Sequence, residues 1–218
     1  FNVLTLRLFS LALPLLAIGA AFDAKNLGIG LFNQIGFSVW IEIIMVILIL
    51  DFCIWLQHLL THKIEFLWRI HRVHHSDTEM DISTAIRFHP IEIALSMALK
   101  IGLVYILGAD PLSVLIFEIL LNGSSIFNHA NINIPNRFDK ILRFLIVTPD
   151  MHRIHHSSDR IEHDTNFGFA LSIWDHMFRT YKLRPERNHK EMEIGLNWQD
   201  EKPEKLGWSL SLPFKKNG

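Results

Sequence analysis

Cysteine is nearly absent from the sequence, since Cys53 is the only one among 218 residues. A single cysteine excludes an internal disulfide bond and a metal site built from cysteine thiolates. Because Cys53 stands in an apolar run, we expect a small buried side chain there. A large net charge of either sign is also missing. The formal charge of −1 gives no argument for nucleic-acid binding.

Histidine, in contrast, is abundant. The sequence has 13 histidines, whereas an average usage of about 2% would give about five. They gather in a few short segments rather than being spread along the chain. Hydrophobic residues make up 50% of the chain and charged residues 20%. This composition indicates more than a bare membrane bundle, with a polar, histidine-rich part beside apolar stretches.

Four apolar stretches predict membrane helices, since a helix that crosses a bilayer needs about 20 apolar residues. The last two are separated only by Gly108, Ala109 and Asp110, which suits a helix end followed by a helix start at Pro111. The predicted fold class is all-α, a multi-pass membrane protein with about four transmembrane helices in two hairpins and a cytoplasmic helical histidine-rich metal-binding cap. The predicted spans are residues 3–22, 37–56, 91–107 and 111–127.

We expect a single domain, residues 1–218, in which hairpins and histidine-rich segments alternate. The sequence starts at Phe1 rather than methionine, which leaves the natural N-terminus open. The first apolar stretch is too long, and too clearly followed by other spans, to be a signal peptide alone. The expected order is a first transmembrane hairpin (1–56), a first histidine cluster (57–90), a second hairpin (91–127), a second histidine cluster (128–181) and a cytoplasmic tail (182–218).

The basic residues predict the orientation. Only Lys25 lies between the first two spans, and no basic residue lies between the last two. The segments that contain the histidines are rich in Lys and Arg. The positive-inside rule therefore places both histidine clusters and the C-terminus in the cytoplasm, for an integral protein of the bacterial inner membrane or the endoplasmic reticulum. The basic residues of the first segment are Lys63, Arg69, Arg72 and Arg87.

Lys100 and Glu118 lie inside the third and fourth predicted spans. Charges at bilayer depth are costly, so we expect the two to pair with each other or to be sheltered by protein. The alternative is that the second hairpin is a buried element of a soluble core.

His58 and His62 close the second span with a spacing of four residues, which places both rings on one helical face. Asp51 precedes His58 by seven residues, and seven steps of 100° return to within about 20° of the start. Asp51 therefore shares this stripe. We predict that it accepts the outer ring N–H of a ligand histidine or balances the charge of a metal.

A pattern of three histidines occurs twice, and its spacing places all three rings on one face of a helix. From His62 to His71 is nine residues, or about 180° on a continuous helix. If the two groups share a metal, the chain must turn between Thr61 and Arg69. The two segments are His71-Arg72-Val73-His74-His75 and His152-Arg153-Ile154-His155-His156.

Neutral imidazole binds Fe, Zn, Cu and Ni well, and two metals with four or five nitrogen ligands each need eight to ten histidines. His129 supplies one more ring at the end of the fourth span. His89, just before Pro90, is a tenth ligand, a group that orients one, or a residue at a helix start. We expect His163, His176 and His189 to stay outside the set. The predicted ligands are His58, His62, His71, His74, His75, His129, His152, His155 and His156.

In order and spacing, these residues resemble the fatty acid hydroxylase superfamily, which includes C-5 sterol desaturase-like proteins. The resemblance runs from Asp51 to Tyr181. The sequence departs from the family at Arg179, where a glycine is common, and at Asn133, where some fatty acid hydroxylases have a second histidine. Further matching segments are Arg87-Phe88-His89-Pro90, Asn128-His129-Ala130-Asn131, Pro149-Asp150-Met151, Asp164-Thr165-Asn166-Phe167-Gly168 and Trp174-Asp175.

The resemblance implies a membrane-bound non-haem oxygenase with two iron ions and O2 as co-substrate. It would hydroxylate or desaturate a lipid (sterol, fatty acyl or related), with electrons from NAD(P)H through a separate cytochrome b5-like or ferredoxin-type donor. Zinc could substitute for iron on the same ligands. Polar residues around the ligands would orient imidazoles or relay protons, or equally cap helices and form turns. These are Asn128, Asn131, Asp150, Asp164 and Asn166.

The main alternative is a zinc-dependent membrane hydrolase that acts on a lipid. Such an enzyme needs fewer histidines and a carboxylate base, and Glu65 and Glu79 lie outside any H-E-x-x-H pattern. A metal transporter or haem carrier would place its histidines within the spans rather than at their ends. The sequence leaves the substrate, the choice between hydroxylation and desaturation, and the oligomeric state open.

Overall fold

The computed structural model describes residues 2–189, 191–198 and 203–216, with side chains from Pro14 onward. These residues form helices and no β-strand, which confirms the all-α prediction. The only strand-like pairings among them are two isolated antiparallel bridges, Ile146–Leu171 and Ser157–Ile194. The chain divides into two compact units, the first made of Phe1–Ile54 and Ile93–Asn122 and the second of Trp55–Glu92 and Gly123–Gly218.

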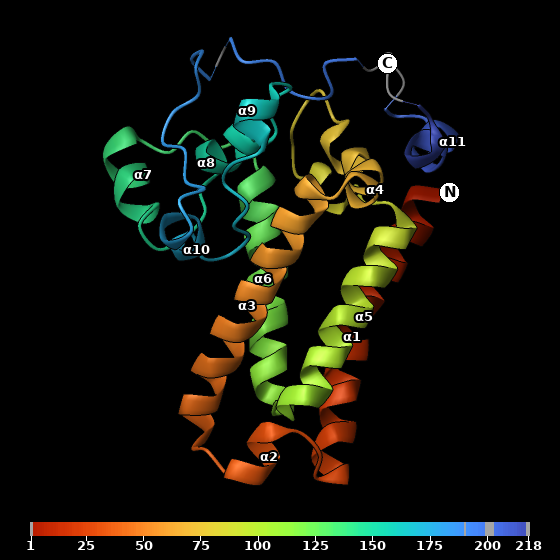
Figure 1. The fold of residues 1–218 in the computed structure, drawn as a ribbon, viewed down its shortest axis with the longest axis vertical. Helices are drawn as coiled ribbons and strands as arrows, with labels where there is room; N and C mark the ends of the chain where they lie inside the picture. Colours follow the sequence, from red (N-terminus) through yellow and green to blue (C-terminus); the bar gives the residue numbers. More distant parts are fainter. Residues whose placement is uncertain (1, 190, 199–202, 217–218) are drawn as a thin grey trace. The chain divides into compact units, whose positions relative to one another are not determined.

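The first unit contains most residues of the apolar helices. Four stretches of the described chain are long and apolar enough to cross a membrane, which confirms the predicted number of spans: Pro14–Ile35, Val39–Lys63, Pro90–Leu107 and Pro111–His129. The predicted first span, 3–22, overlaps the first of these only from Pro14, and the side chains before Pro14 lie outside the described part of the chain. The corresponding elements are α1 (Asn2–Leu27), α2 (Leu31–Ile35), α3 (Val39–Lys63), α5 (Pro90–Leu107) and α6 (Pro111–His129) (Figure 1).

The turn between α5 and α6 packs against the turn between α1 and α2. Gly108 ends α5 in the left-handed conformation, with φ +64°. A Cβ atom added at Gly30 would collide with the backbone of Gly108, so this close approach requires glycine. Lys25 Nζ lies 2.6 Å from Asp110 Oδ2. The two predicted hairpins are therefore fastened to each other at their turns.

Lys100 and Glu118 form an ion pair between α5 and α6, which confirms the expectation that they pair with each other. Only 7% of the Lys100 side chain and 3% of the Glu118 side chain are exposed. Asn122 Nδ2 donates to Glu118 Oε2 at 3.2 Å. The helices thus bury two compensating charges rather than one isolated charge. Cys53, which we expected to be buried, is partly exposed on α3.

The second unit contains short helices around the histidines. At Ile64 the backbone is extended, with φ −101° and ψ 114°, so α3 ends at Lys63 and a new helix starts at Glu65. This bend is the turn predicted between Thr61 and Arg69. The helices of this unit are α4 (Glu65–His75), η1 (Thr84–Ile86), α7 (Asn136–Leu142), α8 (Pro149–His155), α9 (Arg160–His163), α10 (Ile173–Met177), α11 (Leu206–Ser211) and η2 (Leu212–Phe214).

The C-terminal tail packs on α4. Arg72, on the buried face of α4, donates through Nη2 to Leu212 O at 2.6 Å and to Lys215 O at 2.8 Å. Its guanidinium lies 5.0 Å from the ring centre of Trp198. Earlier in the tail, Ile194 forms the antiparallel bridge to Ser157. The tail therefore touches both histidine-rich segments. The apolar contact consists of Val73, Leu196, Trp208 and Leu212, with Trp68 and Trp198 packed against them.

Candidate metal centre

Two buried groups of histidines lie in the second unit. In each group, one ligand atom from every ring lies within 4.8 Å of all the others. The groups adjoin, since the rings of His75 and His156 stack at 4.5 Å. The first group is His58, His62, His71, His75 and His155, and the second is His74, His129, His152 and His156.

Four helices supply these rings. The last turns of α3 carry His58 and His62, and the last residue of α6 is His129. Helix α4 contributes to both groups, and so does α8 together with the residue that follows it. Thr148 caps α8 by accepting from Met151 N at 3.4 Å, and Pro149 starts the helix. The two groups together contain the nine histidines that the spacing predicts as ligands.

The outward ring nitrogens of several histidines face acceptors. His58 Nδ1 lies 2.7 Å from Phe167 O, and His129 Nδ1 lies 2.7 Å from Ser125 O. His155 Nδ1 lies 2.8 Å from Thr165 O. Because a carbonyl oxygen can only accept, each of these Nδ1 atoms carries the hydrogen. The inward Nε2 atom of each ring then holds a bare lone pair.

The inward nitrogens approach one another closely. His58 Nε2 lies 3.2 Å from His71 Nε2, and His129 Nε2 lies 3.2 Å from His74 Nε2. Where both nitrogens are bare, their lone pairs repel unless a cation lies between them. Two nitrogens bound to one ion at about 2.1 Å, roughly 90–110° apart, lie about 3.0–3.4 Å from each other. The observed separations therefore fit a shared metal ion.

Other rings of the two groups lack hydrogen-bond partners although they are buried. Both ring nitrogens of His75 and of His156 have none, and His155 Nε2 has none. Buried polar atoms without partners are costly and rare in native proteins. Metal ligation would satisfy one nitrogen of each ring, so the residues present fit a two-metal centre.

Burial keeps these rings neutral. Several histidines of both groups have a pKa well below the ordinary value. The main cause is desolvation, and repulsion from neighbouring rings adds to it. Neutral imidazole is the form that binds a metal, so no proton has to be removed near neutral pH. The histidines concerned are His74, His75, His152, His155 and His156.

Two carboxylates lie behind ligand rings. Glu92 Oε1, at the start of α5, lies 2.6 Å from His71 Nδ1 in a buried contact. Asp164 Oδ1 lies 3.5 Å from His62 Nδ1. A carboxylate hydrogen-bonded to a ligand ring, as Glu92 is, fixes the ring orientation and increases the basicity of the ligand. The contact of Asp164 with His62 is longer and is not a hydrogen bond. Asp164 was among the residues expected near the ligands. Glu92 was not, because its 21-residue separation from His71 gives no local signal.

Asp175 organises the segment behind His58. Its carboxylate accepts hydrogen bonds from Phe167 N at 2.9 Å and Gly168 N at 2.8 Å. It also accepts from Trp55 Nε1 at 3.0 Å. Phe167 is the residue whose carbonyl meets His58 Nδ1. Asp175 thus holds an acceptor of a ligand histidine, a role that the Trp-Asp pattern alone does not reveal.

Several other polar residues around the ligands form hydrogen bonds with neighbouring segments. Asn128 Nδ2 donates to Phe169 O at 2.6 Å. Asn131 Oδ1 accepts from Arg153 at 3.3 Å. Asn166 Nδ2 donates to Met151 O at 3.0 Å. Asp150 lies in the first turn of α8. Asp51 is buried on α3, two helical turns before His58.

Of the four remaining histidines, only His163 belongs to a group of possible metal donors among the described residues. His89 belongs to neither group, since its Nδ1 accepts from Ile91 N and its Nε2 meets Leu210 O. His176 Nε2 meets Arg143 O at 3.0 Å. His189 is half-buried rather than fully solvated. His163, which we expected outside the ligand set, joins His62 and Asp164 in a third group of mutually close donor atoms.

The family model for fatty acid hydroxylase matches residues 43–180, and the chain belongs to this family. It is 30% identical to ornithine lipid hydroxylase OlsE of Rhizobium tropici, over 70% of this chain and 45% of that protein. It is 29% identical to human (Homo sapiens) alkylglycerol monooxygenase, over 63% of this chain and 30% of that protein.

Cholesterol 25-hydroxylase of Rattus norvegicus is 27% identical, over 66% of this chain and 48% of that protein. The chain therefore spans less than half the length of these curated relatives. No solved structure gives a significant match. The family and the four apolar helices together indicate a membrane protein.

Proposed function

We propose that this chain is a membrane-bound lipid hydroxylase with a non-haem di-iron centre. The observation that carries the proposal is the pair of buried histidine groups, whose nitrogens converge with bare lone pairs. His58, His62, His71, His75 and His155 would hold one ion, and His74, His129, His152 and His156 the other. The curated relatives are named as hydroxylases or monooxygenases of lipids, which favours hydroxylation over desaturation.

Bound iron would supply the redox chemistry with O2 that an unactivated C–H bond requires and that no side chain provides. In the net reaction one oxygen atom enters the lipid and the other leaves as water. Two electrons from a separate donor and two protons complete the balance. The chain itself contributes rigid ligand placement: Glu92 holds His71, and the carbonyl of Phe167 holds His58. It also excludes bulk water, since none of the nine rings exposes more than 4%.

We also propose that both histidine groups face the cytoplasm, where a soluble or membrane-anchored electron donor reaches them. The proposal rests on the concentration of Lys and Arg in the histidine-rich segments. A fluorescent protein fused to the C-terminus in a bacterial host should fluoresce, whereas a periplasmic alkaline phosphatase fusion at the same position should be inactive.

The test starts with metal content. Protein purified in mild detergent from iron-fed cells should contain close to two irons per chain, with nitrogen-rich ligation by X-ray absorption. With O2, a reductant and a reductase system, it should transfer one 18O atom from 18O2 into an ornithine lipid, an alkylglycerol or a sterol. A single tightly held zinc, with no uptake of a second metal, would instead favour the hydrolase.

The matched variants are His155→Ala and His189→Ala. His155 has a bare inward nitrogen within the five-histidine group, so its loss should abolish turnover and lower bound metal. His189 lies outside every group of donor atoms among the described residues, so its loss should change neither. Full metal and full turnover in His155→Ala would contradict the proposed ligand set.

A further inference from the structure

The nine ligand rings are sealed from solvent. The least buried is His62, with 4% of its surface exposed, and several of the others expose none. A metal ion from solution therefore needs a route to the two groups, and His62 is where that route is shortest.

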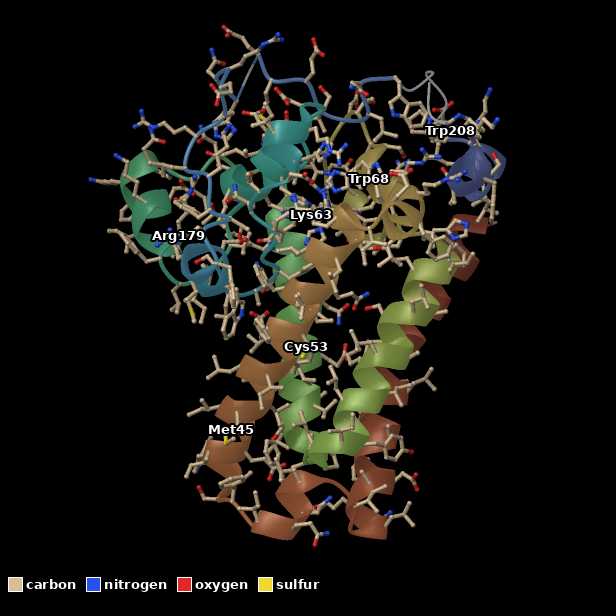
Figure 2. All side chains as sticks on the ribbon, viewed as in Figure 1. Met45, Cys53, Lys63, Trp68, Arg179 and Trp208 are labelled. Atoms are coloured by element: carbon tan, nitrogen blue, oxygen red, sulfur yellow. The ribbon has the colours of Figure 1, made fainter. Side chains whose placement is uncertain are left out.

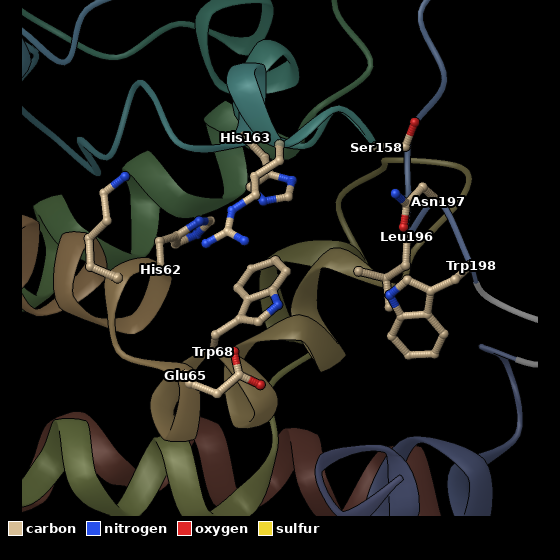
Figure 3. A pocket seen from close by; sticks show the side chains of 11 residues that line it. His62, Glu65, Trp68, Ser158, His163, Leu196, Asn197 and Trp198 are labelled. Atoms are coloured by element: carbon tan, nitrogen blue, oxygen red, sulfur yellow. The ribbon is translucent and has the colours of Figure 1, made fainter. Parts of the chain in front are cut away.

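A pocket of about 390 Å³ reaches His62 from the surface. His62 is the only one of the nine ligand histidines that lines it. Figure 3 shows His62, Trp68 and His163 on one side of this pocket, with Asn197 and Trp198 on the other. Figure 2 places Lys63 and Trp68 beside the nitrogen-rich side chains of the second unit. The pocket thus connects solvent to an edge of the five-histidine group.

His163 is held in the wall of this pocket in a form that can bind a metal. Its ring stacks on Trp68, with 4.9 Å between ring centroids and 23° between planes. Its Nδ1 lies 3.3 Å from Ser157 O, so Nδ1 carries the hydrogen and Nε2 keeps its lone pair. The ring centroids of His163 and His62 lie 5.6 Å apart.

Asp164 completes a group of three donors. One atom each from His62, His163 and Asp164 lies within 4.8 Å of the other two. Asp164 Oδ2 is neutralised by Lys63 Nζ at 2.8 Å and by Arg160 Nε at 3.8 Å. These two cationic side chains are 47% and 79% exposed. Ion pairs this exposed are weak, so an arriving divalent ion can displace both cations.

We propose that His62, His163 and Asp164 form an outer metal site, which receives a divalent ion from the pocket and passes it to the five-histidine group. His62 belongs to both groups, so one side chain links the outer site to the five-histidine group. Lys63 and Arg160 hold Asp164 between loading events and return to it once the ion has moved inward. This inference rests on the proposed metal centre but not on its reaction.

The test measures the rate of metal uptake. Full-length protein in detergent is stripped with a chelator, mixed with Co²⁺ and followed by its visible absorption, and elemental analysis then gives final occupancy. His163→Phe keeps an aromatic ring against Trp68 but removes the donor atom. We expect uptake to slow by about tenfold or more, because loss of even a group that supports a metal ligand costs about 10–100-fold in metal affinity, with final occupancy unchanged.

The matched control is His176→Phe, since His176 also stacks on an aromatic ring, Phe144, but lines no part of the pocket. Its uptake rate should equal that of the wild type. Lys63→Gln should accelerate uptake, because it removes a competing cation from Asp164. This opposite sign keeps the test informative even if His163→Phe folds poorly.

Two outcomes would overturn the inference. In the first, His163→Phe and Lys63→Gln both load at the wild-type rate, so the pocket is not the route. In the second, His163→Phe loses final occupancy, so His163 is a resident ligand. A wild-type chain that never binds two ions would refute the proposed metal centre instead, and the two failures are thus distinguishable.

Discussion

Glu92 and Arg179 illustrate how the role of a single position depends on the structure around it. Glu92 meets His71 in a buried pair at 2.6 Å. Arg179 adopts a positive φ of 60°, a conformation that favours glycine. This explains why a glycine is common here in the family that the sequence resembles. In both cases the residue type makes physical sense only once the backbone around it is known.

Replacing Glu92 with Gln should weaken metal binding without unfolding the protein. The amide keeps the size of the side chain but loses the charge that holds His71 Nδ1–H, and loss of such a partner costs about 10–100-fold in metal affinity. Competition with a chromophoric chelator measures this directly. Glu79→Gln is the control, since Glu79 is exposed. Equal affinities in the two variants would show that Glu92 does not support the centre.

At the scale of elements, the two H-R-x-H-H segments are alike in sequence but not in surroundings. On α4, Arg72 is fully buried and holds the C-terminal tail through two carbonyl oxygens. On α8, the equivalent Arg153 is only partly buried and reaches Asn131 at 3.3 Å. The tail therefore supports the first segment through a side chain and the second through backbone contacts at Ser157 and Ile194.

Arg72→Lys should destabilise the second unit by about 1–3 kcal/mol, since it leaves at least one buried carbonyl without its charged donor. Lysine keeps the charge, so the loss reports the two-carbonyl contact rather than electrostatics. Arg153→Lys should change stability little. Thermal unfolding monitored by circular dichroism compares the two variants. A larger effect from Arg153→Lys would contradict the assigned role of the tail.

The pair between α5 and α6 makes a second prediction at this scale. Lys100→Met alone should cost about 3–5 kcal/mol, because it leaves Glu118 charged and buried. Adding Glu118→Met should recover most of this loss, since replacing a whole buried pair by apolar residues is often neutral. Lys140→Met, at an exposed position, is the control. Unfolding midpoints in one detergent measure all four proteins.

The sequence predicted the elements well and their partners poorly. Apolar length, Gly108 and Pro111 were enough to place the long helices, because those signals are local. Histidine spacing was enough to select the nine rings that the structure brings together, because helix periodicity is also local. Glu92 at His71, Asp175 behind His58 and the tail on Arg72 escaped prediction. These depend on contacts between residues 21, 109 and 140 positions apart in the chain, respectively.

At the scale of the whole molecule, three long helices have residues in both compact units. These are α3, α5 and α6. Each also brings a group to the metal centre within the second unit: His58 and His62 from α3, Glu92 from α5, and His129 from α6. Metal binding at the proposed centre would therefore fix the ends of the helices that make up most of the apolar part of the chain.

Removing the metal should consequently destabilise the entire chain and not only the histidine-rich unit. A ligand present at 1,000 times its dissociation constant stabilises the folded state by about 4 kcal/mol. Chelation should lower the unfolding midpoint by several degrees, and restoring two equivalents of Fe²⁺ under anaerobic conditions should reverse the change. An unchanged midpoint would mean that the nitrogen cluster is stable without an ion.

Helices α4 and α8 also supply rings to both histidine groups, and this shared scaffold links the occupancy of one ion to that of the other. The first ion to arrive orders two helices that the second ion also needs, so the second meets part of its ligand set already in place. Occupancy should then rise steeply with metal concentration, and chains holding a single ion should be scarce at every stage of loading. Such cooperativity would suit the proposed two-electron chemistry, because few chains would hold a half-filled centre when oxygen arrives.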